Sequence, residues 1–523
     1  MPLANRMERG RLGRIILVLG VLSAAICGKA PADPGAFGDQ RVTVRLLDGE
    51  KLIGLRAGVP MNIGAGNAVS EVAAGTYALH LSSAKAARQR FHLFTKSFQP
   101  GEEAEERAYI AEWKANGRDA EAVVVGMQLE TQSGTVLDSR VHWISIAQFE
   151  TEEQAKSAKA KLEREGQWTW MNAETIVPGS GRVEIKNAKG EVVASLDAPI
   201  TIRSGAPIRV SNVDTGFWKE DKKQLEYAGT IEVGVDPKAR LMLTEALPVE
   251  TYLEGVLPAE MPSSWPLGAL KAQAVAARSE VLASLGTKHA LEGFEFCGSE
   301  HCRAYLGASG RRDTTNAAVR ETAGEILVRD GKIVPTVFSS NCGGWTESNE
   351  TVWRAPANPA LRAVGDLVGG KGTPPMKRGI SAWLTQSQKA NCSGDTEHFR
   401  WRKRYTVDEL SAIVNKRHGV GGISKIVLGE RGEGGRLKSV TITGSKRTVT
   451  VEKELPIRSA FGGLPSAMFA LDREGGTYTF TGGGRGHGVG LCQYGARGMA
   501  ELGIVYTEIV LHYFSGTRLE RYR

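Results

Sequence analysis

The chain has 523 residues, of which 41% are apolar and 24% are charged. This composition is typical of a soluble globular protein, and the length predicts two to four domains. The formal net charge is +8, and the first thirty residues, with five Lys or Arg and one acidic residue, carry half of it. The remaining half of the positive charge is spread too thinly over the rest of the chain to form the dense basic stripe of a nucleic-acid-binding protein. We therefore expect no nucleic-acid partner.

The first thirty residues have the pattern of a secretory signal. Four arginines between residues 6 and 14 precede an apolar run over residues 15–27, and small residues follow at 28–30. The run is too short to cross a bilayer as a helix, so we predict a signal peptide over residues 1–30, with a short membrane anchor as the alternative. An exported protein would function in the periplasm or the cell wall, where its cysteines would be under oxidising conditions.

The next part of the chain alternates in hydropathy and then changes to a strand–helix repeat. Residues 31–85 predict a small β segment and linker. Residues 86–175 contain two copies of a strand, an acidic helix start, a helix and a glycine. The second copy resembles the SPOR (sporulation-related repeat) module, which binds glycan strands stripped of their peptides. The alternative is a generic ferredoxin-like α+β domain, with the aromatics Phe98, Trp143 and Phe149 in its core instead of on its surface.

Residues 180–523 form the third part. Strand-like alternation continues to about residue 235, and helical spacing follows at residues 247–257 and 265–285. Residues 366–400 are rich in Gly, Lys, Ser and Pro and predict an irregular insertion. The expected fold is therefore α+β and multidomain: a region with a central cleft, preceded by a ferredoxin-like domain.

Residues 253–278 (LEGVLPAEMPSSWPLGALKAQAVAAR) contain the first candidate catalytic group, Glu260. We expect Glu260 in a short connection between two helices, where Pro258 and Pro262 limit backbone freedom. Its apolar neighbours would favour a general acid. From these residues alone, an exposed glutamate near a helix start explains the pattern more simply.

Two glycine-containing segments further along the chain suit a sugar-binding surface. Residues 482–490 alternate glycine with Arg485, His487 and Val489, and such a backbone can approach a flat ligand closely. A tight series of turns is the alternative. The candidate binding residues of the two segments are Ser340, Gly343, Gly344, Thr346, Arg485, His487 and Gln493.

Cys297 and Cys302 lie close in sequence, with His301 between them and His289 upstream. The four residues predict a structural zinc site, or else a Cys297–Cys302 disulfide, which the oxidising compartment favours slightly.

Four segments, at residues 253–278, 295–305, 338–346 and 484–496, match in order the motifs of the SpoIID/LytB family (stage II sporulation protein D and the amidase enhancers). The chain resembles this family over roughly residues 230–523, apart from the insertion. Gly268 stands where the family has glutamate, and Ser279 and Glu280 replace threonine and tyrosine.

The resemblance implies that Glu260 is the catalytic residue of a lytic transglycosylase, and that the two glycine-containing segments line one cleft. The substrate implied is peptidoglycan glycan strands stripped of their peptides, with no cofactor required. Some family members hold zinc near the residues equivalent to Cys297 and Cys302. The resemblance also places Cys342 close to Cys492, while Cys392 is left over.

Two other functions remain open. One is a non-enzymatic enhancer that activates an N-acetylmuramoyl-L-alanine amidase as its partner. The other is a glycan-binding protein without activity.

Overall fold

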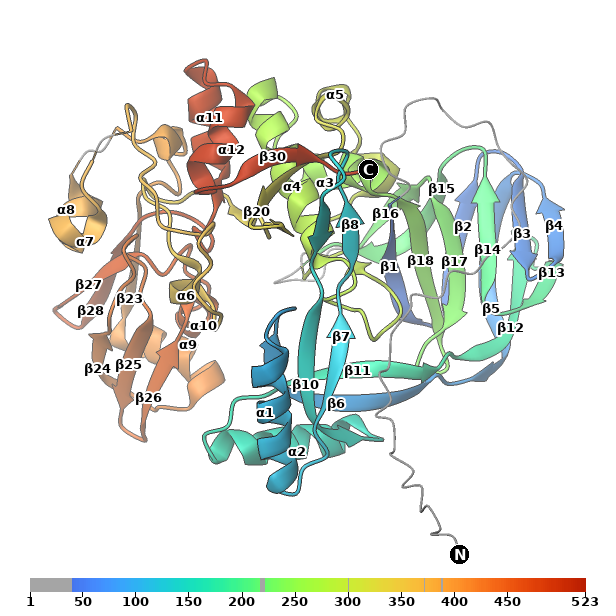
Figure 1. Cartoon of the computed structure of the whole chain (residues 1–523), viewed down its shortest axis with the longest axis horizontal. Coiled ribbons are helices and arrows are strands. Elements are labelled where there is room, and N and C mark those ends of the chain that lie inside the picture. Colours follow the sequence, from blue (N-terminus) through green and yellow to red (C-terminus); the bar gives the residue numbers. More distant parts are fainter. Residues whose placement is uncertain (1–39, 217–221, 300, 371, 387–388) are drawn as a thin grey trace, which may run out of the picture.

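The computed structural model describes residues 40–523 except 217–221, 300, 371 and 387–388. The predicted signal peptide, including Cys27, lies outside the described residues. Figure 1 shows a mixed α+β chain with sheets at one end, helices in the middle and a smaller lobe at the other end. No helix in the described part of the chain combines the length and apolar character needed to cross a membrane.

Two large sheets share one apolar core. The seven-stranded sheet has the order β19-β1-β18-β17-β14-β3-β4 and the six-stranded sheet β13-β12-β5-β2-β15-β16. Their strands are β1 (Arg41–Glu50), β2 (Leu52–Ala57), β3 (Met61–Ala65), β4 (Ala68–Val72), β5 (Gly75–Lys85), β12 (Ser180–Asn187), β13 (Val192–Asp197), β14 (Ile200–Ser204), β15 (Ile208–Asp214), β16 (Lys222–Tyr227), β17 (Thr230–Val235), β18 (Leu241–Pro248) and β19 (Phe296–Cys297).

These sheets correct the expected domain limits. β1 pairs with β18 and β5 pairs with β12, so the strands before residue 86 belong to the same two sheets as residues 180–248. The alternation that predicts strands is visible in β17, where Ile231, Val233 and Val235 are buried and the residues between them are not. Alternation gives the buried face of a strand but not its partner, and the partner of β1 lies about 200 residues away in sequence.

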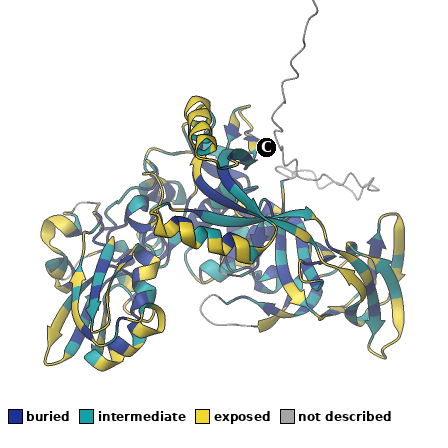
Figure 2. Cartoon of the chain, turned by 90° about the horizontal axis from the view of Figure 1, so that it is seen from below, coloured by how far each residue is buried: buried dark blue, intermediate teal, exposed yellow. Residues whose placement is uncertain are grey.

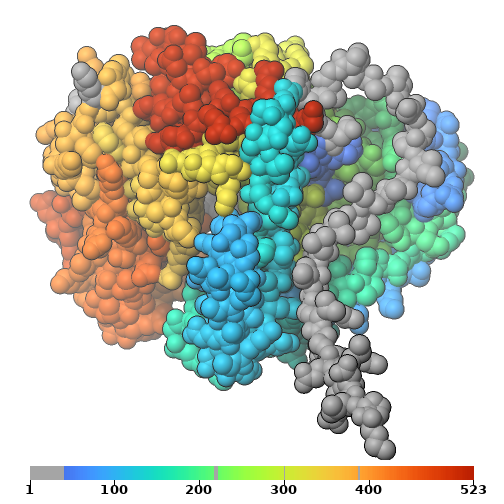
Figure 3. Space-filling view, in the orientation of Figure 1, coloured from blue at the N-terminus to red at the C-terminus, as the bar shows by residue number. Residues whose placement is uncertain are grey.

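Residues 88–177 form a ferredoxin-like domain inserted between these strands. The domain contains β6 (Arg88–Phe98), α1 (Glu103–Ala115), β7 (Glu121–Val125), β10 (Val141–Phe149), α2 (Glu152–Arg164) and β11 (Trp170–Val177), with a small hairpin of β8 (Gln128–Glu130) and β9 (Val136–Asp138). The sheet order is β11-β6-β10-β7, which is the βαββαβ arrangement expected from the repeat. Figure 3 shows this domain against the centre of the molecule.

Both faces of the ferredoxin-like sheet are covered at least in part. One face packs α1 and α2 around Leu93, Phe98 and Ile144, and the other packs Phe94, Val123 and Val125 against Leu291. The tip of the β8–β9 hairpin also pairs with the C-terminal residues, since the backbone of Thr131 bridges to that of Tyr522. The domain therefore contacts the rest of the chain at two places, at Leu291 and at the C-terminal residues.

The centre of the molecule is a group of helices against the seven-stranded sheet. It contains α3 (Val249–Glu260), α4 (Leu267–Ser284), α5 (Asp313–Glu321), α11 (Gln493–Glu501) and α12 (Tyr506–Tyr513), with β20 (Glu325–Arg329), β21 (Lys332–Ile333) and β30 (Arg518–Arg521) beside them. α4 has buried residues all round, because α3, α5, α11 and α12 all pack on it. Figure 2 shows buried residues along the strands in the interior of the molecule and exposed residues on the outer helices and hairpin ends.

A short parallel pair of strands, β22 (Phe338–Ser339) and β29 (Leu491–Cys492), joins two distant motifs. Phe338 lies opposite Leu491, and Ser339 lies opposite Cys492. This pairing places the segment after residue 338 beside the glycine-rich loop and the start of α11.

Residues 401–482 form a separate lobe with its own core, which the sequence did not predict. Its elements are β23 (Trp401–Thr406), α9 (Val407–His418), β24 (Ile423–Leu428), β25 (Ser439–Gly444), β26 (Thr448–Glu452), α10 (Glu454–Ala460), β27 (Phe469–Glu474) and β28 (Thr477–Gly482). The expected irregular insertion, residues 366–400, holds the short helices α7 (Pro375–Arg378), α8 (Ile380–Thr385) and η2 (Asn391–Gly394). The remaining short elements are α6 (Asn349–Val352) and η1 (Gly307–Gly310).

Candidate functional site

Glu260 is the last residue of α3, not part of the connection after it. Pro258 lies inside the helix, whose last turn closes with a hydrogen bond from the Met261 N–H to the Leu257 carbonyl. Met261 then turns to an extended conformation, and α4 begins at Leu267. The helix thus delivers Glu260 at its C-terminal end, with a half-buried side chain.

Gln493, the first residue of α11, contacts Glu260 directly. Its side-chain amide nitrogen lies 3.2 Å from the Glu260 carbonyl oxygen and 3.4 Å from the carboxylate Oε2. Gln493 is itself 7% exposed, so its amide is held in place. The motif at residue 260 and the motif at residue 493 therefore meet in space.

An aromatic pair lies on the same two segments. The rings of Trp265 and Tyr494 are 4.8 Å apart in an edge-to-face arrangement, and the Arg497 guanidinium lies 5.5 Å from the Trp265 ring. Tyr494 and Arg497 also line a hollow of about 230 Å³ beside α11. The sequence did not single out Tyr494 or Arg497, although their position directly after Gln493 was a usable signal.

A larger hollow of about 630 Å³ adjoins that hollow and shares the lining residues Val368, Ala390 and Ser393. The rest of its lining is Leu384, Thr385, Gln386, Lys389, Phe399 and Arg400. Glu260 is not among its lining residues. The smaller hollow is the better candidate for a ligand surface, because Tyr494 and Arg497 in its lining contact Trp265 beside Glu260. A central cleft at Glu260 stays a prediction.

Glu254, on the same helix as Glu260, has a separate partner. Its carboxylate lies 3.2 Å from the Arg311 guanidinium. Burial raises the pKa of Glu254, although the Arg311 charge opposes that change. Glu254 therefore serves as a paired structural group.

The glycine-rich loop presents only part of the expected binding set. Arg485 is exposed, and its guanidinium lies 2.6 Å from His398 Nε2. His487 differs from the expectation, because both ring nitrogens have backbone partners. Nε2 donates to the Phe338 carbonyl at 2.8 Å, and Nδ1 accepts from the Val489 N–H at 3.1 Å. These bonds fix a neutral tautomer, and burial together with the Arg436 charge lowers the pKa of His487 to about 3.

Most of the other segment is inside the protein. Thr346 is completely buried, and its hydroxyl accepts from the Val364 N–H at 2.7 Å. Gly343 and Gly344 are buried, and a Cβ at Gly343 would lie 3.1 Å from the backbone of residues 483 and 484. Only Ser340 of this set is half-exposed, with its carbonyl accepting from the Tyr494 N–H. These glycines therefore allow two loops to pack closely. From the sequence spacing alone, that role looks the same as close approach of the backbone to a ligand.

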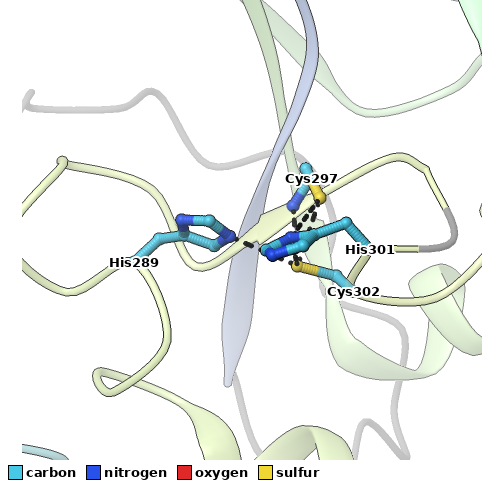
Figure 4. A group of neighbouring side chains, drawn as sticks. All are labelled: His289, Cys297, His301 and Cys302. Carbon is cyan, nitrogen blue, oxygen red and sulfur yellow. Dashed lines mark hydrogen bonds between the residues drawn. The ribbon is translucent and has the colours of Figure 1, made fainter. Parts of the chain in front are cut away.

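His289, Cys297, His301 and Cys302 converge, as Figure 4 shows. The two sulfurs are 3.2 Å apart, Cys302 Sγ lies 3.3 Å from His289 Nε2, and Cys297 Sγ lies 3.4 Å from His301 Nδ1. Zinc bound tetrahedrally at about 2.3 Å to sulfur and 2.0–2.1 Å to nitrogen separates its ligands by roughly 3.5 Å. His289 Nδ1 also contacts Glu292 at 2.7 Å, the carboxylate partner that metal-binding histidines usually have. The donor set therefore fits zinc.

Among the cysteines that the structure describes, none forms a disulfide. Cys342 and Cys492 are close, as expected, since the Cys342 N–H donates to Cys492 Sγ at 3.1 Å. Cys392 is not left over, because its sulfur lies 3.6 Å from that of Cys342. The sequence missed this contact because Cys392 belongs to the insertion, for which no pairing was predicted.

Taken together, these observations define a multidomain α+β protein in which a helix-terminal glutamate meets a glutamine from a glycine-rich motif. The family model described as Stage II sporulation protein matches residues 238–328, which contain Glu260 and the His/Cys group. A second model, a domain of unknown function (DUF8618), matches residues 347–490.

Stage II sporulation protein D of Bacillus subtilis is 31% identical over 290 residues, which cover 53% of this chain and 75% of that protein. An uncharacterized protein of Brachyspira hyodysenteriae is 30% identical, covering 57% of this chain and 73% of the relative. The amidase enhancer of Bacillus subtilis is 29% identical over 52% of this chain, but only 40% of that protein is covered. The chain belongs to the SpoIID family, that of stage II sporulation protein D and the amidase enhancers.

Proposed function

We propose that this protein is a lytic transglycosylase that cleaves the bond between MurNAc and GlcNAc in peptidoglycan glycan strands, with Glu260 as the acid and base. The observation that carries the proposal is the contact between Gln493 and Glu260. It joins two of the four family motifs at one carboxylate.

The chemistry needs one carboxyl group. Glu260 first donates its proton to the glycosidic oxygen, and the bond from that oxygen to C1 of MurNAc breaks. Glu260 then accepts the proton of the MurNAc C6 hydroxyl, whose oxygen bonds to C1 and closes a 1,6-anhydro ring. The nucleophile belongs to the substrate, so a second protein carboxylate, as in ordinary glycoside hydrolysis, is not required.

Other residues have supporting roles in this proposal. The Gln493 amide orients the Glu260 carboxylate and stabilises its charged form after proton donation. Trp265 and Tyr494 offer an aromatic surface for a sugar ring, and Arg485 offers exposed hydrogen-bond donors. His487 and Thr346 are positioning residues, since their polar atoms hold the surrounding backbone.

The group of His289, Cys297, His301 and Cys302 would hold a structural zinc ion in this proposal. Zinc would cross-link His289 and the pair His301 and Cys302 to Cys297 in β19, which pairs with β1. No catalytic step depends on it. We place the protein in the cell envelope, in keeping with the pattern of residues 1–30, and with glycan strands as its ligand.

A non-enzymatic amidase enhancer is the second candidate function. The name of the Bacillus subtilis relative supports it, and the family alone does not separate the two candidates. In that case the partner would be an N-acetylmuramoyl-L-alanine amidase.

Product analysis distinguishes the candidates. Purified protein would be incubated with glycan strands with and without attached peptides, and soluble products identified by mass spectrometry. Anhydro-MurNAc ends support the transglycosylase. Intact strands, together with faster amidase cleavage when the protein is added, would support the enhancer and overturn our proposal.

A further inference from the structure

A second group of metal-binding side chains lies beneath the Gln493 segment. Cys342, Asp366, Cys392 and Cys492 come from four separate parts of the chain, and their ligand atoms all lie within 4.8 Å of one another. The three cysteines and the aspartate are at most 1% exposed.

The spacing of the group fits a tetrahedral metal site. Cys342 Sγ lies 3.6 Å from Cys392 Sγ and 3.2 Å from Asp366 Oδ2. Zinc bonds of about 2.3 Å to sulfur and 2.0–2.2 Å to oxygen place tetrahedral ligands roughly 3.4–3.8 Å apart. A disulfide would need sulfurs about 2.0 Å apart.

Hydrogen bonds around the group orient its ligands. Asp366 Oδ1 accepts from the Tyr513 hydroxyl at 2.8 Å and from the Asn391 amide at 3.1 Å, which leaves Oδ2 directed at Cys342. The Cys342 N–H donates to Cys492 Sγ, a contact that stabilises a thiolate. Such outer contacts are characteristic of built metal sites.

Gly495 makes room for this arrangement. A Cβ at residue 495 would lie 2.6 Å from Asp366 Oδ2 and would also collide with the Tyr513 hydroxyl. The absence of a side chain at this position of α11 therefore lets the aspartate and tyrosine reach the sulfurs.

We infer that Cys342, Asp366, Cys392 and Cys492 bind a zinc ion as a structural site. Three thiolates select a soft or borderline metal, and zinc accepts a four-ligand site of sulfur and oxygen. Its positive charge would offset the ligand charges, which are costly to bury alone. All four positions are occupied by protein groups, so the site has no open coordination position for catalysis.

The site would fasten the segments that meet at Glu260. Cys492 directly precedes Gln493, and the Cys342 segment pairs with the Cys492 segment through β22 and β29. The ion would also tie the insertion, through Asp366 and Cys392, to the start of α11. This inference does not depend on the reaction that the protein catalyses.

The test is zinc content per chain, measured by mass spectrometry of metals on full chain purified under reducing conditions without added metal. Cys392→Ser and Cys302→Ser form a matched pair, since each removes one sulfur from one group. The expected result is that Cys392→Ser holds one equivalent of zinc less than the wild type, and that Cys302→Ser still holds the zinc of the Cys342 group even if its own group loses an ion. This criterion is independent of whether the His289 group binds a metal.

Zinc content unchanged by Cys392→Ser would overturn the inference, as would a Cys342–Cys492 disulfide in wild type purified separately without reductant. If Cys392→Ser does not fold, cobalt(II) reconstitution of the Cys302→Ser protein tests the Cys342 group instead. A thiolate-to-cobalt absorption band then supports the site, and a folded protein without that band contradicts it.

Discussion

Gln493 touches Glu260 at two points, through the backbone carbonyl and the carboxylate, across 233 positions of sequence. The first contact fixes the end of α3 relative to the start of α11. The second gives the carboxylate a donor on one side. The geometry of the proposed acid and base therefore depends on a residue from another motif.

The first prediction concerns Glu260→Gln, which keeps the size of the side chain but cannot donate or accept the proton. We expect folded protein that binds glycan and releases anhydro-MurNAc about 100-fold more slowly or not at all. Glu254→Gln is the matched control, because it changes a carboxylate six residues earlier on the same helix, one paired with Arg311. Release near the wild-type rate by Glu260→Gln would exclude Glu260 as the acid and base.

The second prediction concerns the partner of Glu260. Gln493→Glu places a second carboxylate beside the first, and like charges favour the protonated form. Since a general acid must be protonated, we expect the alkaline limb of the pH–rate profile to move to higher pH by on the order of one unit. Gln493→Ala should lower kcat without that shift. Identical pH profiles for wild type and Gln493→Glu would show that the two side chains are not coupled.

The sequence predicted the helices better than it predicted the contacts between distant segments. The strand–helix repeat over residues 86–175 predicted both α1 and α2, and Thr151 caps α2 by accepting from the Gln154 N–H. The boundary at Glu260 was missed because proline usually marks the end of a helix, whereas Pro258 is accommodated inside the last turn of α3. The residues next to Pro258 in sequence do not show how far tertiary burial stabilises such a turn.

The roles of the polar residues were harder to predict than their positions. Thr346 and His487 have side chains suited to sugars, but the structure uses their polar atoms to satisfy buried backbone groups. A buried N–H or carbonyl needs a partner wherever a loop is irregular. Sequence alone does not show which backbone groups lack one, so structural and ligand-binding polar residues look alike.

The third prediction concerns the ferredoxin-like domain, for which we propose glycan binding. Trp168 is 44% exposed, and its ring lies 5.3 Å from that of Trp170 at a tilt of 34°. Phe98, an expected surface aromatic, is 2% exposed and belongs to the core. We expect Trp168→Ala in the full chain to weaken binding to amidase-treated sacculi several-fold, and Trp168→Phe to retain most of it, because the aromatic face is kept. Equal binding of wild type and Trp168→Ala would exclude this surface.

The fourth prediction concerns the group in Figure 4. Cys302→Ser removes one of two sulfurs that lie 3.2 Å apart, and we expect loss of one zinc equivalent and a lower Tm. Chelation of the wild type should lower Tm in the same way. If the two thiols form a disulfide instead, the ring is small, stabilises by only about 2 kcal/mol, and responds to reductant but not to chelator.

The fifth prediction concerns the acid stability of the fold. Burial lowers the pKa of His487 to about 3, whereas an unfolded histidine titrates near 6.5. Between these values the unfolded chain binds a proton that the folded chain does not. The free energy of unfolding should therefore fall as the pH drops below about 6.5, by up to ~1.4 kcal/mol per pH unit from this residue.

His487→Gln removes the titrating ring and retains an amide that can donate to the Phe338 carbonyl. Urea unfolding of both proteins at pH 7 and pH 5 measures the difference. We expect the variant to be less stable than the wild type at pH 7 but to lose less stability on acidification. Equal losses in the two proteins would show that His487 is protonated in the folded state, and that its two backbone hydrogen bonds do not hold it neutral.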